Sequence, residues 1–538
     1  MSAATPHAQY AYRRSPDQDR RAPAHHSVVI VGAGPVGLSL AIDLAQRGRN
    51  VVLLDDSDRI GGGSRAICFA RRTLEIFDRL GVGDRMIEKG VTWEKGKVFQ
   101  GEELLYEFNL SPEGGCKRPA FINLQQYYVE HFLASRAAEL PQIDARWRNR
   151  VIAVVAAPDH VRLTIETPDG AYEMTSDWLI ACDGARSTIR TSLGLEFAGT
   201  AFNDQFLIAD VKMAADFPSE RWFWFDPPFH SGKSALLHKQ PDNVWRIDLQ
   251  LGPEANAEDE KRPEAVRPRI ERMLGRNDFE LEWLSVYRFQ CRRLRRFVHE
   301  RVVFAGDAAH LVSPFGARGA NSGVQDADNL GWKLDVVLSG GAGPTLIESY
   351  DIERAAAADE NIRHSTSATD FIAPHSGGEA RWRNAALSLA RDVDFAKRFV
   401  NSGRLSTASS YRESPLSTPD AETWPGALGP GDALPDAPLQ NGSGEPVWLS
   451  DVVGAAFSEI CLGDAHRPEI PGVERIILCP QDAAGAGPRD VEGVFAARTG
   501  LRPGDVLLVR PDGHIAARLR SPSMSDLDQA MGRARGVR

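Results

Sequence analysis

The chain has 538 residues, of which 42% are hydrophobic, and this length exceeds one ordinary core, so we expect about two to four domains. Its 63 basic and 73 acidic side chains give a net charge of −10 without a Lys/Arg tract, which argues against nucleic acid as a partner. No apolar run reaches the ~18 residues of a membrane span, and the first 26 residues lack the apolar core of a signal peptide, so we expect a cytoplasmic protein without membrane association.

The chain opens with a polar segment, residues 1–26, rich in Pro, His and Arg. This composition predicts a flexible N-terminal arm, with order beginning at Ser27.

A glycine-rich turn follows the first predicted strand, 28–31. Gly32, Gly34 and Gly37 lie between this apolar run and a helical stripe at 38–45. The first glycine permits a tight turn, the second lets backbone N–H groups approach a pyrophosphate, and the third allows close helix packing. A second apolar run ends at Asp55, about 20 residues on, where an acid would accept bonds from an adenosine ribose. The pattern predicts a dinucleotide-binding unit.

Antiparallel strands are expected next. Short apolar runs at 151–155 and 161–165, followed by turn residues at 167–170, indicate a β-meander that completes a first nucleotide-domain segment, 27–200. Broken strands within 201–289 then indicate an inserted mixed sheet, which we assign as the substrate domain.

The second half of the chain begins with a return to the nucleotide domain over 290–400. A strand starts at Val302, and an apolar stripe predicts a helix from about 321 to 339, ended by Gly340 and Gly341. Residues 401–447 are rich in Ser, Pro, Gly and Asp, which indicates a linker. A C-terminal domain, 448–538, contains a predicted hairpin at 506–518. The six cysteines show no C-x-x-C spacing, which disfavours disulfides, a zinc site and dithiol chemistry.

Two further strand ends carry an aspartate in a small turn: Asp183 in Cys-Asp-Gly-Ala-Arg-Ser, and Asp307 in Ala-Gly-Asp-Ala-Ala-His. With the opening glycines and the run Pro314 to Gly323, these motifs resemble the three fingerprints of the FAD-dependent aromatic hydroxylases, the single-component flavoprotein monooxygenases, over roughly residues 27–370. The C-terminal part is similar to the thioredoxin-like appendage of the phenol and 3-(3-hydroxyphenyl)propionate hydroxylase branch. The resemblance implies an α/β fold with a Rossmann-like FAD-binding domain, the meander, the inserted substrate domain and a thioredoxin-like domain lacking C-x-x-C.

The resemblance also implies which residues contact FAD. Gly306 would admit the ribityl chain, Asp307 would accept a hydroxyl hydrogen bond, and the backbone N–H groups at Gly319–Asn321 would face the flavin pyrimidine ring. The complete set of expected cofactor-binding residues is Gly32, Gly34, Pro35, Gly37, Asp55, Arg65, Gln126, Val151, Asp183, Gly306, Asp307, Pro314, Gly319, Ala320 and Asn321. Asp183 has the alternative interpretation of a turn or helix-capping residue.

The activity implied is hydroxylation of a phenolic substrate, with NADH or NADPH as transient electron donor, dioxygen as co-substrate and a C4a-hydroperoxyflavin as oxygen donor. Trp224, His238 and Arg246 are the candidate substrate contacts, each with a structural alternative, and no catalytic base is assigned. The family implies a homodimer as the expected assembly. Two competing hypotheses remain: a flavin-dependent halogenase, because of the motif Trp222 to Pro227, and a non-catalytic nucleotide-binding regulator.

Overall fold

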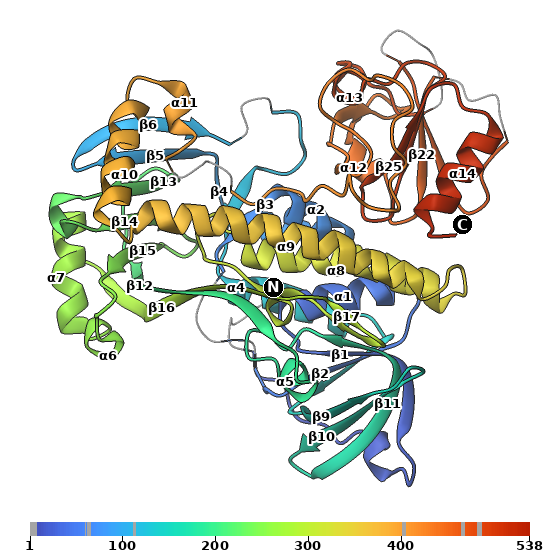
Figure 1. Cartoon of the computed structure of the whole chain (residues 1–538), viewed down its shortest axis with the longest axis horizontal. Coiled ribbons are helices and arrows are strands. Elements are labelled where there is room, and N and C mark those ends of the chain that lie inside the picture. The colour runs from blue at the N-terminus through green and yellow to red at the C-terminus, as the bar shows by residue number, and fades with distance from the viewer. Residues whose placement is uncertain are drawn as a thin grey trace.

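The computed structural model describes residues 8–59, 61, 66–110, 114–400, 405–463, 468–480 and 487–537, with Asn203 described by its backbone alone. Figure 1 shows three bodies: one around β1, β2 and β11, a second around β12 to β16, and the C-terminal body, drawn in orange and red. The helices α8 (Gly319–Leu338) and α9 (Thr345–Ile372) pack against each other between these bodies. The expected α/β architecture is confirmed.

The first sheet has the strand order β17-β18-β11-β1-β2-β8, and β10 and β9 extend it from β11. The strands β18, β11, β1, β2 and β8 run parallel, and long connections join them, as parallel pairing requires. The apolar residues of β1, β2, β18 and the second half of β11 are buried, as expected of a parallel sheet covered on both faces. The bounds are β1 Ala24–Val31, β2 Val51–Asp55, β8 Ile143–Trp147, β9 Arg150–Ala156, β10 Val161–Thr167, β11 Gly170–Ala181, β17 Val298–His299 and β18 Val302–Phe304.

Contrary to the expected flexible arm, the described residues before Ser27, 8–26, pack against the rest of the protein. β1 begins at Ala24, and the short 3-10 helix η1 (Pro16–Asp19) precedes it. Asp17 is buried and pairs with Arg146 at 2.8 Å, while Tyr10 stacks on Trp147 with ring centroids 4.1 Å apart. The composition of this segment is polar, but its acid and its tyrosine have partners on β8 that no local pattern reveals.

The second sheet has the order β19-β16-β12-β15-β14-β13-β5-β6. One of its faces packs against α7, through Val266 and Ile270, and the opposite face carries an aromatic cluster that includes Phe206 and Phe315. A third, small sheet has the order β3-β7-β4. The bounds are β3 Cys68–Ala70, β4 Val91–Trp93, β5 Lys95–Gln100, β6 Glu103–Asn109, β7 Phe121–Asn123, β12 Phe197–Lys212, β13 Arg221–Phe225, β14 Ser234–Lys239, β15 Val244–Leu251, β16 Glu280–Leu294 and β19 His310–Leu311.

Helices cover these sheets and join them. α1 packs against α8 and α4, and α2 packs against α8. The remaining helices before the C-terminal body are α1 Pro35–Gln46, α2 Arg71–Arg79, α3 Gly83–Lys89, α4 Gln126–Ala138, α5 Thr188–Ser192, α6 Ala257–Glu260, α7 Pro263–Leu274, α10 Gly377–Ala390 and α11 Asp394–Lys397, with 3-10 turns η2 Pro228–His230 and η3 Gly306–Ala308.

The C-terminal body is built on a sheet of order β23-β22-β24-β25, and the segment in front of it carries the ribbon β20-β21. Part of the segment expected to be a linker is closely packed, because Ser409, Tyr411 and Ser414 are buried against charged residues of α9. The bounds are β20 Pro438–Gln440, β21 Pro446–Trp448, α12 Leu449–Val452, β22 Ser458–Leu462, β23 Glu474–Leu478, α13 Val494–Thr499, β24 Val506–Val509, β25 Ile515–Leu519 and α14 Met524–Ala534.

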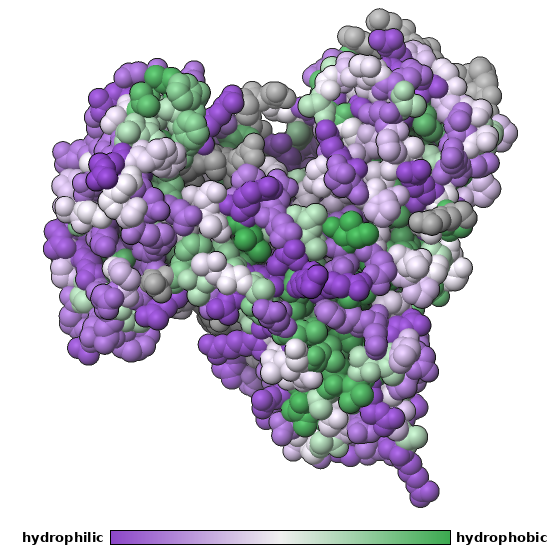
Figure 2. Space-filling view, in the orientation of Figure 1, coloured by the Kyte–Doolittle hydropathy of each residue, from purple (hydrophilic) through white to green (hydrophobic). Residues whose placement is uncertain are grey.

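Hydrophilic residues dominate the face of the molecule seen in Figure 2, and a hydrophobic strip runs over the region of the β9–β11 meander. Ile152 and Val155 of β9 are among the exposed large hydrophobic residues. Within the described ranges, no helix combines the length and the apolar character that a membrane span requires.

Candidate active site

The carboxyl ends of three parallel strands lie side by side at one edge of the first sheet. β1 pairs with β11 and β11 pairs with β18, each through its last residue. Gly32, Asp183 and Gly306 follow directly or within two residues of these strand ends. Ligands of open α/β sheets bind at the carboxyl ends of the strands. The three sequence motifs therefore converge on one edge.

The glycine turn contains two positions where packing requires glycine and one that is open. Gly32 has φ +107°, and a Cβ there would lie 2.3 Å from the Cys182 carbonyl oxygen. A Cβ on Gly37 would lie 2.0 Å from the Gly32 oxygen. Gly34 has no heavy atom within 4 Å of an added Cβ, and Pro35 begins α1 directly after it. The space in front of Gly34 and the N-terminus of α1 is therefore accessible to a ligand.

Asp55 lies at the end of β2 and is linked to this turn. Its Oδ2 accepts the Ala33 N–H at 2.6 Å, and its Oδ1 accepts the Ser57 N–H at 2.9 Å. Burial raises the pKa of Asp55, and these two N–H groups act in the opposite direction. The Asp55 carbonyl accepts the Asn149 N–H at 2.8 Å, which brings the start of β9, including Val151, to the same edge.

Gln126, at the start of α4, anchors the loop in front of β3. Its Oε1 accepts the Ala66 N–H at 3.0 Å, and its Nε2 donates to Glu130 at 2.7 Å. Arg65, predicted from the same loop, lies outside the described residues.

The Gly306–Asp307 turn is held in place by contacts with α1 and α8. Gly306 has φ +61°, and a Cβ there would lie 2.9 Å from Val36 of α1, so glycine is required. The Gly306 N–H donates to Asp326 Oδ2 at 2.9 Å. Asp307 itself is exposed, so its carboxylate reaches the surface at the end of β18.

Asp326 of α8 is a buried anchor that sequence reasoning missed. His310 Nε2 lies 2.7 Å from its Oδ2, and Arg354 of α9 donates to its Oδ1 at 2.6 Å. Burial tends to raise the pKa of Asp326, but His310 and Arg354 outweigh this and lower it. His310 therefore has a structural role. The one signal in the sequence for this anchor was that a charged residue, Asp326, lies among the apolar residues of the helix predicted at about 321–339.

Asp183 lies at the N-terminus of the short helix α5, whose N-cap residue is Ser187. Its Oδ2 accepts the Ile189 N–H of α5 at 3.2 Å, in agreement with the capping alternative. Its Oδ1 is buried without a hydrogen-bond partner in the part of the chain that the structure describes. Burial is the main cause that raises its pKa.

The loop from Pro314 to Gly319 leads into α8. Pro314 is exposed, Gly319 and Ala320 are half-buried, and no side chain caps the helix N-terminus. The Asn321 side chain is fully engaged. Its Oδ1 accepts from Ala70 N and Thr73 Oγ1 at 2.8 and 2.6 Å, and its Nδ2 donates to the carbonyls of Cys68 and Ala317 at 2.9 and 2.6 Å. Asn321 can therefore offer only its backbone N–H to a ligand.

The three predicted substrate contacts do not share one environment. Trp224 stacks on Phe99, with centroids 5.2 Å apart, and belongs to the cluster on the α7 face of the sheet. Because side chains alternate along a strand, it points away from the face that meets Phe315, so the expectation that Trp224 contacts the substrate is not supported. His238 and Arg246 are buried on that other face, and Arg246 is paired with Asp210.

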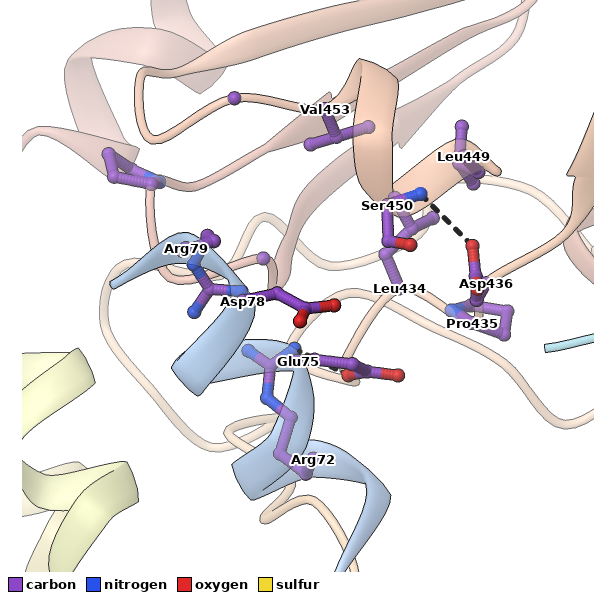
Figure 3. A pocket seen from close by; sticks show the side chains of 13 residues that line it. Arg72, Glu75, Asp78, Arg79, Leu434, Pro435, Asp436, Leu449, Ser450 and Val453 are labelled. Carbon is purple, nitrogen blue, oxygen red and sulfur yellow. Dashed lines mark hydrogen bonds and ion pairs between the residues drawn. The ribbon is translucent and has the colours of Figure 1, made fainter. Parts of the chain in front are cut away.

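A separate cavity lies between α2 and the C-terminal body (Figure 3). Arg72, Glu75 and Arg79 project from α2 toward Leu434, Asp436 and Ser450. Arg72 pairs with Glu75 at 3.2 Å and also donates to the Asp512 carbonyl of the C-terminal body, and Arg79 pairs with Asp328 of α8. The cavity is a junction between bodies and contains none of the three strand-end motifs.

Residues 25–365 match the family model described as FAD binding domain. The chain belongs to this family. It is similar to a probable NADH-specific resorcinol 4-hydroxylase of Rhodococcus jostii (28% identity, 94% of this chain and 93% of the relative). It is also similar to a 3-(3-hydroxy-phenyl)propionate/3-hydroxycinnamic acid hydroxylase of Klebsiella pneumoniae (30% identity, 91% of both chains). The fold is shared with the crystal structure of the flavin-dependent monooxygenase PieE in complex with FAD and substrate (TM-score 0.80, 24% identity, 96% of this chain and 100% of that chain).

The FAD-binding family and its named hydroxylases identify the chain as an FAD-dependent aromatic monooxygenase. They support this assignment over the halogenase and regulator hypotheses.

Proposed function

We propose that FAD lies along the edge formed by the three strand ends and that the enzyme hydroxylates a phenol. The pyrophosphate would lie at Gly32–Gly37 and the N-terminus of α1, the adenosine ribose at Asp55, and the flavin ring at the start of α8. The remaining proposed contacts are Pro35, Arg65, Gln126, Val151, Asp183, Gly306, Asp307, Pro314, Gly319, Ala320 and Asn321.

The residues present suit such a cofactor. Open space in front of Gly34 accommodates phosphate oxygens, and the uncapped N-terminus of α8 leaves backbone N–H groups for an electron-rich ring. Asp183 keeps one buried oxygen without a partner among the described residues. Asp307 is exposed and follows β18, the strand that pairs with β11, which Asp183 follows. The adjacency of the three strand ends is the observation that carries the proposal.

Bound FAD supplies electron transfer from NADH or NADPH to dioxygen and oxygen transfer to the ring. The chain's own residues must hold the phenol against the flavin, exclude water and remove the phenolic proton. A phenolic substrate is supported by the names of the relatives, a probable resorcinol 4-hydroxylase and a 3-(3-hydroxy-phenyl)propionate/3-hydroxycinnamic acid hydroxylase.

The test is turnover of the purified holoenzyme with resorcinol or 3-(3-hydroxyphenyl)propionate, NADH or NADPH, and ¹⁸O₂. We expect bound FAD, phenol-stimulated oxidation of the reduced nucleotide, and one ¹⁸O atom in the product. Failure to take up FAD, or a product lacking ¹⁸O, would contradict the proposal. Light scattering of the same sample tests the expected homodimer.

A further inference from the structure

A row of buried polar side chains crosses the second sheet. Arg221 of β13 is directly opposite His238 of β14, His238 is opposite Arg246 of β15, and Arg246 is opposite Asp210 of β12. Directly opposed residues share a face, so all four project to the same side. Each is at most 6% exposed. Asp248 lies two residues beyond Arg246 and therefore belongs to this face as well.

Only part of this row is internally paired. Arg246 makes two hydrogen bonds of 2.8 Å to Asp210. In contrast, Arg221 Nε, His238 Nδ1 and Asp248 Oδ1 are buried and have no hydrogen-bond partner in the described part of the chain. Native proteins pair almost all buried polar atoms, so three unpaired ones on one face need an explanation. A polar ligand would provide the missing partners.

The row faces the proposed flavin position. Phe206, which lies on the same face of β12 as Asp210, packs edge-on against Phe315, with centroids 5.0 Å apart. Phe315 belongs to the loop that leads into α8. Cys68 of β3 lies near the row, since Arg221 and Arg246 both influence its thiol, and its carbonyl accepts the Asn321 amide at 2.9 Å. The row thus lies beside the segment that would hold the flavin ring.

The protonation states of the row's titratable side chains decide which of them can accept a proton. Burial raises the pKa of Asp248 to about 6, and the facing groups Arg246, Asp210 and Arg221 modify it. Burial, with Arg221 and Arg246, lowers the pKa of His238, so its imidazole is neutral at pH 7. Burial keeps the Cys68 thiol protonated, because it raises the thiol pKa to about 11. Asp210 is held by two hydrogen bonds from Arg246, and the lowered pKa of His238 makes it a weak base. Asp248, which has an unpaired buried oxygen, is therefore the acceptor of the row.

We propose that Asp248 accepts the phenolic proton of the substrate and that Arg221 binds the resulting phenolate, with His238 as a neutral hydrogen-bonding neighbour. This assignment rests on the proposed function. The substrate O–H bond breaks, an O–H bond forms on Asp248, and the negative charge moves from the carboxylate to the phenolate oxygen. The combined charge of the row and the substrate does not change, and the ionised phenol is the more electron-rich ring for oxygen transfer.

The test compares Asp248→Asn with the wild type on resorcinol and on ring-fluorinated resorcinols of increasing acidity. With resorcinol, hydroxylated product per reduced nucleotide oxidised is expected to fall about 100-fold, the scale of general-base catalysis. The variant is expected to recover with phenols already ionised at the assay pH. Its rate should rise with pH near the pKa of the phenol, whereas the wild-type rate should rise near pH 6. Glu280→Gln is the matched control, because Glu280 is an exposed acid of the same sheet.

A binding measurement keeps the inference falsifiable without turnover. The absorbance of bound 4-nitrophenol should show ionisation at lower pH in the wild type than in solution, and Arg221→Gln should remove this shift. If Asp248→Asn forms as much hydroxylated product per reduced nucleotide oxidised as the wild type, the inference is overturned while the hydroxylase function stands. The same holds if the variant loses product equally with phenols of every acidity. If wild-type holoenzyme neither binds nor hydroxylates any of these phenols, the proposed function fails and the inference fails with it.

Discussion

The three glycines of the opening motif have one spacing but three different surroundings. Gly32 and Gly37 are constrained by backbone atoms within 2.3 Å and 2.0 Å of an added Cβ. Gly34 has ordinary extended geometry, with φ −76° and ψ −177°, and open space around it. The fold therefore requires the first and third glycines, whereas the second leaves room for a ligand.

This difference gives a prediction. Gly34→Ala should fold with an unchanged melting temperature in the apoprotein, because alanine adopts its backbone angles without strain. Its FAD affinity should fall about 10- to 100-fold, since displacing a phosphate from a charge-assisted hydrogen bond costs about 1.5–3 kcal/mol. FAD titration by fluorescence measures this. Gly37→Ala is the structural control and should lower the melting temperature; FAD binding of Gly34→Ala at wild-type strength would contradict the assignment.

Asp307 offers a second residue-level prediction. Because its side chain is exposed, Asp307→Asn should leave apoprotein stability unchanged, as surface substitutions usually do within about 0.5 kcal/mol. FAD release should accelerate about tenfold, because a neutral amide accepts a weaker hydrogen bond than a carboxylate. Dilution of the holoenzyme followed by flavin fluorescence gives the rate. Asp56→Asn, an exposed acid beside Asp55, serves as the control and should release FAD at the wild-type rate.

At the scale of elements, α8 connects the proposed flavin site to the rest of the molecule. Its first turn carries Asn321, its middle carries Asp326, and its second half carries Trp332 and Lys333, all of which are buried. Asn321 fixes the helix N-terminus against β3 and α2, and Asp326 fixes the Gly306 turn. One helix therefore sets the relative positions of two of the proposed FAD contacts.

Asn321→Asp tests this role. An aspartate near a helix N-terminus normally stabilises by about 0.3–1 kcal/mol. Here its second oxygen would face the carbonyls of Cys68 and Ala317 in place of two donated hydrogen bonds, and leaving such buried groups unpaired costs about 1–3 kcal/mol each. The loss is the larger effect, so calorimetry should show a lower melting temperature, accompanied by faster FAD release. A higher melting temperature would mean that the helix-dipole effect dominates and that the hydrogen bonds from Asn321 to the two carbonyls are unimportant.

Local patterns were sufficient for the backbone of the site. The apolar run before Gly32, the acid at Asp55 and the helix expected at about 321–339 depend on neighbours within a few residues, and α8 is found at Gly319–Leu338. The pairing of Asp326 with Arg354, and of Asp17 with Arg146, joins residues far apart in the chain, so no periodicity reveals it. Trp224 illustrates a third limit: alternation shows which residues share a face but not which face meets the Phe315 loop.

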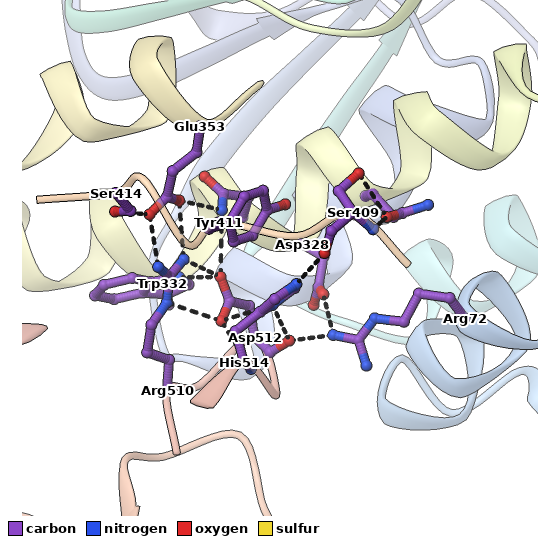
Figure 4. Close-up of polar contacts among 12 residues, drawn as sticks. Arg72, Asp328, Trp332, Glu353, Ser409, Tyr411, Ser414, Arg510, Asp512 and His514 are labelled. Atoms are coloured by element: carbon purple, nitrogen blue, oxygen red, sulfur yellow. Dashed lines mark hydrogen bonds and ion pairs between the residues drawn. The ribbon is translucent and has the colours of Figure 1, made fainter. Parts of the chain in front are cut away.

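At the scale of the whole molecule, the C-terminal body is joined to α8 and α9 by a buried charged network (Figure 4). Glu353 accepts two hydrogen bonds from Arg510, at 2.6 and 3.0 Å, and one from Lys333 at 2.7 Å. Asp512 also pairs with Arg510, and Trp332 Nε1 donates to it at 3.1 Å. Two cations and two anions thus balance in a buried junction. Arg354, the next residue on α9, pairs with Asp326, so the junction adjoins the support of the Gly306 turn.

Glu353→Gln should therefore destabilise the junction between the C-terminal body and the helices α8 and α9. It leaves Lys333 and Arg510 with one buried anion, and breaking a buried ion pair costs about 3–5 kcal/mol. We expect a lower melting temperature and faster proteolysis between residues 405 and 447. The control is the double variant Glu353→Gln/Lys333→Met, which restores the charge balance and should regain part of the lost stability.

The pH dependence of stability separates the charge of Glu353 from its packing. Burial tends to raise its pKa, but Arg510 and Lys333 outweigh burial and hold the pKa well below 4.5. An acid with a depressed pKa in the folded state stabilises fully above its unfolded value, and this stabilisation is lost as the pH falls through the folded pKa. The wild-type melting temperature should therefore decline below about pH 4.5, whereas that of Glu353→Gln should decline less over the same interval, because the variant has no carboxylate to protonate. Parallel declines in the two proteins would show that other acids control the junction.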